Sequence, residues 1–73
     1  MSIIAQHFGR DVSSREVTIR PFHDGKGWCL CAERRSAEPL LFGGYADTLQ
    51  CADWIGRQVA ASEGARFAPC SVQ

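Results

Sequence analysis

The chain has 73 residues, enough for one small domain and too few for two domains that each bury a core. Its 8 Lys and Arg balance its 8 Asp and Glu, and this neutral total argues against a chain that binds polyanions through overall charge. With 45% hydrophobic residues and only 3 prolines, intrinsic disorder is also excluded. We therefore expect a single domain over residues 1–73.

Residues 1–16 form an N-terminal arm whose pattern is ambiguous. The segment SIIAQHF favours either an additional strand or a disordered arm, and GRDVSSRE is typical of a loop. The start lacks the basic residues and apolar run of a secretory signal, and no window approaches the ~18 apolar residues of a membrane span. The expected location is the cytoplasm, without a membrane partner.

A strand is predicted over Val17–Phe22, because apolar and polar residues alternate there. Val17 and Ile19 are expected to face the core. Pro21 cannot donate a ladder hydrogen bond, so the strand should lie at an edge of the sheet, or the proline nitrogen should face solvent.

The Asp-Gly pair in HDGKG, His23–Gly27, predicts a hairpin turn into a second strand over Trp28–Glu33. Alternation along this strand separates two faces, Trp28, Leu30 and Ala32 on one and Cys29, Cys31 and Glu33 on the other.

A short third strand is predicted over Leu40–Phe42, ended by Gly43 and Gly44. Helical periodicity then runs from Tyr45 to Ser62, with a core face made of Tyr45, Leu49, Ala52, Ile55, Gly56 and Val59.

The ends of this helix carry recognisable signals. Gly44 is the expected N-cap, Asp47 lies in the first turn, and Gly64 suits the left-handed residue after the last turn. Gly56 lies inside the helix, which indicates a close approach to the sheet.

A last strand around Phe67 completes the predicted layout. We expect an α+β domain in which a small antiparallel sheet of three or four strands, in the order β-β-β-α-β, carries one helix on one face. If the last strand runs parallel to the strand before the helix, the connection between them is expected to be a right-handed crossover. Nothing obvious covers the other face of the sheet.

The run from Gly27 to Phe67 resembles a group of small bacterial proteins of unknown function. The shared features are a hairpin with a Gly-Trp pair, a phenylalanine, an alanine-rich helix that ends in glycine, and a final strand. The chain departs from that group in its longer arm, its four cysteines and Trp54. The resemblance implies a fold and no catalytic residues.

The chain has four cysteines, which raise the question of zinc or thiol chemistry: Cys29, Cys31, Cys51 and Cys70. The side chains of Cys29 and Cys31, two apart on a strand, do not converge on a tetrahedral metal, and no helix N-terminus activates either thiol. A nucleophile paired with His7 or His23 would lack an oxyanion hole. We therefore expect packing cysteines, no catalytic residues, no metal and no cofactor, with cysteine-based metal binding as the third alternative.

Nucleic acid is the main alternative partner, because basic and aromatic residues lie on or near the first hairpin. The basic candidates are Arg20, Lys26, Arg34 and Arg35. Trp28 shares its predicted face with Leu30 and Ala32, which favours packing over base stacking.

Trp54 is the residue that a monomer explains least well, because it lies opposite the core face of the predicted helix, beside Asp47, Gln58 and Ala61. Tryptophan is enriched at interface hot spots. The sequence therefore predicts a small non-enzymatic interaction module, with Trp54, Gln58 and Asp47 as contact residues and a homodimer or an unknown protein as partner. In the alternative, the arm folds over Trp54 through Ile3, Ile4 or Phe8.

Overall fold

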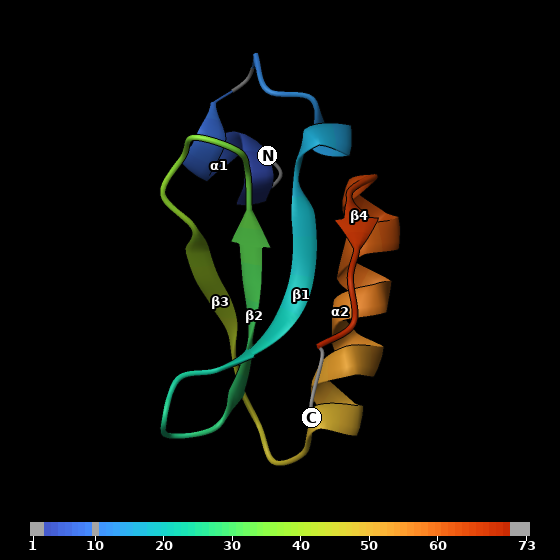
Figure 1. The fold of residues 1–73 in the computed structure, drawn as a ribbon. Coiled ribbons are helices and arrows are strands. Elements are labelled where there is room, and N and C mark those ends of the chain that lie inside the picture. Colours follow the sequence, from blue (N-terminus) through green and yellow to red (C-terminus); the bar gives the residue numbers. More distant parts are fainter. Residues whose placement is uncertain (1–2, 10, 71–73) are drawn as a thin grey trace.

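Four strands form one mixed sheet in the order β3-β2-β1-β4 in the computed structural model, which describes residues 3–9 and 11–70 (Figure 1). The elements are α1 (Ile3–Phe8), the 3-10 turn η1 (Ser14–Glu16), β1 (Thr18–His23), β2 (Trp28–Glu33), β3 (Leu40–Ala46), α2 (Leu49–Glu63) and β4 (Arg66–Phe67). The predicted α+β class, with β-β-β-α-β order, is confirmed.

The first hairpin forms as predicted. β1 and β2 pair antiparallel, with Ile19 opposite Ala32 and Phe22 opposite Cys29. Oδ1 of Asp24 accepts the backbone N–H groups of Lys26 at 2.9 Å and Gly27 at 3.3 Å, so the loop is held by its own aspartate.

One strand pair departs from the predicted antiparallel sheet. β4 lies parallel to β1, where Arg66 N–H donates to the Val17 carbonyl and Ala68 N–H donates to the Ile19 carbonyl, both at 3.0 Å. β3 and β4 lie at opposite edges of the sheet and run in the same direction. α2 runs back along the sheet between them and carries the chain from β3 to the far side of β1, where β4 pairs (Figure 1). The parallel crossover considered from the sequence is therefore present, from β3 through α2 to β4.

Pro21 lies in an interior strand, so the first of the two positions expected for it, an edge strand, is wrong; its side chain is buried. The carbonyls of Val17 and Ile19 point toward β4, and alternation turns the Pro21 nitrogen to the same side. Since β4 pairs only with Thr18 and Ile19, the missing N–H costs no ladder bond.

β3 is longer than predicted, because Gly43 and Gly44 continue the strand rather than end it. Both have positive φ, 90° and 66°, and the pairing with β2 shifts register between Trp28 and Leu30. Glycine adopts this left-handed backbone freely, so the pair produces an irregular bend within the strand.

As a consequence, α2 begins four residues later than predicted and Tyr45 belongs to β3. The N-cap is Thr48 rather than Gly44, and its hydroxyl accepts the Cys51 N–H at 3.1 Å. Asp47 precedes the cap and is outside the first turn. Gly64 ends the helix in the left-handed conformation, as predicted.

The close approach predicted at Gly56 is confirmed. A Cβ placed there would lie 2.8 Å from Cε1 of Phe67 and 3.1 Å from Cδ2 of Leu30. The face of the sheet that carries Leu30 is therefore the one that α2 covers.

The arm is neither a strand nor disordered over its described residues. It forms α1 and η1, and the Ile4 side chain is 1% exposed in a buried cluster with Val17, Ile19, Ala32 and Ala60. The Ile4 N–H donates to Oε1 of Glu63 at 3.4 Å, so α1 lies against the end of α2 on the same face of the sheet. Six residues are too few to hold a helix alone, and these tertiary contacts stabilise it.

In residues 3–9 and 11–70, no helix is both long and apolar enough to span a bilayer.

Candidate interaction surfaces

The face of the sheet opposite α2 has no helix over it in the described part of the chain. Strand register and alternation place on this open sheet face Thr18, Arg20, Phe22, Cys29, Cys31, Glu33 and Leu41. This agrees with the expectation that one sheet face lacks a cover. Leu41 is 48% exposed there, which leaves an apolar side chain available to a partner.

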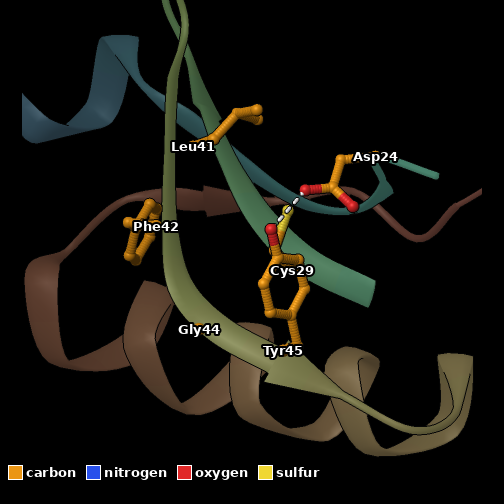
Figure 2. Close-up of a pocket in the computed structure, with 6 residues that line it drawn as sticks. All are labelled: Asp24, Cys29, Leu41, Phe42, Gly44 and Tyr45. Atoms are coloured by element: carbon orange, nitrogen blue, oxygen red, sulfur yellow. Dashed lines mark hydrogen bonds between the residues drawn. The ribbon is translucent and has the colours of Figure 1, made fainter. Parts of the chain in front are cut away.

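Tyr45 and Asp24 bound a shallow hollow at one end of the open sheet face (Figure 2). The Tyr45 hydroxyl donates to Oδ2 of Asp24 at 2.8 Å, and the hollow of about 160 Å³ is also lined by Cys29, Leu41, Phe42 and Gly44. Figure 2 shows the Cys29 sulfur beneath the Tyr45–Asp24 hydrogen bond, with Leu41 and Phe42 leaving β3 in different directions.

The hydrogen bonds around Asp24 set the protonation of both groups. The N–H of Lys26, followed by the Tyr45 hydroxyl, holds the pKa of the Asp24 carboxyl below its ordinary value. The hydrogen bond to Asp24 raises the pKa of the Tyr45 phenol. Both groups keep their neutral-pH forms, a carboxylate that accepts and a phenol that donates.

Cys29 and Cys31 are buried although no helix of the described residues covers their face; they are 7% and 3% exposed. Burial is the largest cause that raises the pKa of both thiols, so neither is held as a reactive thiolate. His23 pairs with Trp28 on the opposite face and does not reach Cys29 as a base.

The other two cysteines lie elsewhere. Cys51 is exposed on α2, and Cys70 is partly buried beyond β4. Among residues 3–9 and 11–70, no three His, Cys, Asp or Glu side chains are grouped as metal ligands.

Trp54 is 64% exposed on the outer side of α2. The arm does not cover it, since Ile4 points into the core, and the alternative in which the arm folds over Trp54 is wrong for the described residues. Gln58 is exposed one turn further along the helix, while Asp47 is exposed ahead of the Thr48 cap.

Apart from Arg57, the exposed residues around Trp54 on α2 carry no charge. These uncharged residues form what we name the α2 stripe, made of Gln50, Cys51, Trp54, Gln58 and Ala61. Arg57 borders the stripe, and its Nε donates to Oδ2 of Asp53 at 2.8 Å, so the nearest charge is paired. Helical periodicity predicts the position of Trp54 on the outer side of the helix, whereas the uncharged stripe around it follows from the exposure of the neighbouring residues.

The basic residues expected to bind nucleic acid do not gather on one surface. Arg20 forms an ion pair with Glu33, and Nη2 of Arg34 lies 3.3 Å from Oε2 of Glu16. Lys26 is in the β1–β2 loop, whereas Arg34 and Arg35 lie at the far end of β2, six strand residues or about 20 Å away (Figure 1). Nucleic-acid binding through the hairpin stays a prediction that this placement does not favour.

Comparison with known proteins finds no matching family model, no matching curated protein and no matching solved structure.

Proposed function

We propose that this chain is a small non-enzymatic interaction module that self-associates as a homodimer through the α2 stripe. The observation that carries the proposal is Trp54, which is 64% exposed at the centre of the uncharged α2 stripe. The outer face of a surface helix normally carries several charged residues, whereas here the charge of Arg57 lies at the edge of the stripe and is paired with Asp53.

The composition of the stripe suits contact with a second copy. In a twofold dimer the same patch meets itself, so any unpaired charge on the patch would face its own copy. The α2 stripe avoids this repulsion, and the Asp53–Arg57 ion pair is already neutral at its border. Tryptophan at the centre with glutamines around it matches the aromatic core and polar rim of protein interfaces.

The same proposal keeps the cytoplasm as the compartment, because a reducing compartment maintains free thiols. All four cysteines are free. The resemblance of residues 27–67 to small bacterial proteins stays a prediction and supplies no activity. Asp47 would lie at the rim, near the start of the stripe.

Size-exclusion chromatography with light scattering, run over a dilution series in reducing buffer, tests this function. We expect a dimer that dissociates on dilution, and a monomer at every concentration for Trp54→Glu. Because Trp54 is exposed, this change should alter the free energy of unfolding by no more than about 0.5 kcal/mol.

Leu41→Glu is the matched control, since it places the same charge at an exposed apolar residue of the open sheet face. It should leave the dimer intact. A Trp54→Glu variant that remains dimeric, or a dimer lost only in Leu41→Glu, contradicts the α2 stripe as the interface. A short bismaleimide cross-linker acting through the exposed Cys51 gives a second readout, and the covalent dimer should disappear in Cys51→Ser.

A further inference from the structure

Three arginines from two separate segments surround one hollow at the end of the sheet where β2 finishes and β4 begins. The residues that line it are Glu16, Arg34, Arg35, Ser36 and Arg66. The register brings them together, because Thr18 on β1 pairs with Glu33 on one side and with Arg66 on the other. The segments that contribute these arginines therefore flank the same residue of β1.

The charge in this hollow is unbalanced although the whole chain is neutral. Its lining holds one carboxylate, Glu16, and that group is engaged by Arg34 at 3.3 Å. Arg35 and Arg66 are exposed, and within residues 3–9 and 11–70 neither forms an ion pair. The like charges of these side chains repel one another until an anion lies between them.

The turn between β2 and β3 fixes part of the lining. Ala37 N–H donates to the Arg34 carbonyl at 3.2 Å, and Ser36 takes a left-handed backbone with φ of 62°. The turn thereby holds Arg34, Arg35 and the Ser36 hydroxyl in consecutive positions at the rim of the hollow. A hydroxyl donor beside guanidinium groups is a common arrangement around oxyanions.

We propose that this hollow binds a phosphate group. A guanidinium presents a planar fork of N–H donors that matches phosphate oxygens, and Arg35 and Arg66, which form no ion pair within the described residues, supply two such forks. A phosphate carries more charge than a single carboxylate and can accept from both forks and from Ser36 at once. The group is either a free small phosphate or a phosphate of a nucleotide chain, and the chemistry of recognition is the same.

The test is a titration of the full chain with inorganic phosphate at low ionic strength, followed by NMR of the arginine Nε–H resonances. We expect saturable shifts at Arg35 and Arg66, and only weak effects from chloride at equal ionic strength. Since a charge-assisted hydrogen bond contributes about tenfold or more to binding, Arg66→Ala and Arg35→Ala should each weaken phosphate binding by about that factor.

Lys26→Ala is the matched control, because it removes the same charge at the opposite end of the sheet. Its phosphate affinity should stay unchanged. Arg35 lies in a turn outside the strands, so Arg35→Ala keeps the test valid if Arg66→Ala disturbs β4. Shifts that do not saturate, or an equal loss in Lys26→Ala, overturn the proposal.

A single-stranded oligonucleotide added to the phosphate-bound protein distinguishes the two sources. Competition for the Arg66 resonance at lower concentration than free phosphate assigns the site to a nucleotide chain, and absence of competition assigns it to a small phosphate. The α2 stripe does not line this hollow, so Trp54→Glu should bind phosphate normally even if the proposed dimer fails.

Discussion

The Tyr45 hydroxyl donates a 2.8 Å hydrogen bond to Oδ2 of Asp24, which ties β3 to the loop of the first hairpin. Tyr45→Phe removes this bond and should lower the free energy of unfolding slightly at neutral pH, because both groups are exposed. Chemical denaturation of the two proteins across a pH series measures the difference.

This difference should depend on pH at both ends of the range. The folded pKa of Asp24 is lowered, so the contribution of Asp24 to the free energy of unfolding is present above its ordinary pKa of 3.8. That contribution is lost as pH falls through the lowered value. The folded pKa of Tyr45 is raised, so the contribution of Tyr45 to the free energy of unfolding is present below its ordinary pKa of 10.0. That contribution is lost as pH rises through the raised value. A difference that stays constant from acid to alkaline pH would contradict this hydrogen bond.

Ile4→Ala should destabilise the domain by about 2–4 kcal/mol, because it empties a site in the buried cluster beside Val17 and Ala60. Urea unfolding measures the loss. Asp11→Ala, a change at an exposed residue of the same N-terminal arm, is the comparison and should cost much less. Equal and small effects of the two changes would show that α1 does not contribute to the core.

Gly56→Ala should lower stability although alanine favours helix by about 1 kcal/mol. The new methyl group would lie 2.8 Å from the Phe67 ring, and overpacking costs about 1–3 kcal/mol. Arg57 lies over that ring at 4.7 Å, which restricts its movement. In the Phe67→Leu background the penalty should shrink, and thermal unfolding of the four proteins of this cycle checks it. Stabilisation by Gly56→Ala alone would contradict the close contact.

Alkylation should separate the cysteines by their positions. Cys51 is exposed and should react first, whereas Cys29 and Cys31 are buried with raised pKa values and should react slower by about tenfold or more. Mass spectrometry of peptides after timed exposure to iodoacetamide at neutral pH gives the rates. Equal rates for Cys29, Cys31 and Cys51 in the folded protein would contradict the burial of Cys29 and Cys31.

Local patterns predicted the elements whose signals are local. Alternation located the buried Val17 and Ile19, the Asp-Gly turn located β2, and the left-handed Gly64 located the end of α2. Helical periodicity also located Trp54 on the outer side of the helix. These features depend on neighbouring residues in the chain, so no tertiary information was needed.

The remaining features depend on contacts between distant residues. Two adjacent glycines normally end a strand, but here Gly43 and Gly44 bend one, and Tyr45 moves from the predicted helix to the sheet. The helix α1 has only six residues and relies on partners such as Glu63. The arginine hollow requires Arg66 to lie near Arg34, which follows only from the parallel register of β4.

The pairing of β4 with β1 also affects how the chain folds during its synthesis. β1 is an interior strand only because of Arg66 and Phe67, which are synthesised more than forty residues after it. Until they dock, one side of β1 offers unpaired N–H and C=O groups at Thr18 and Ile19 to any passing strand. The period of greatest aggregation risk for this domain is therefore its synthesis, after the hairpins have formed and before these last two strand residues arrive.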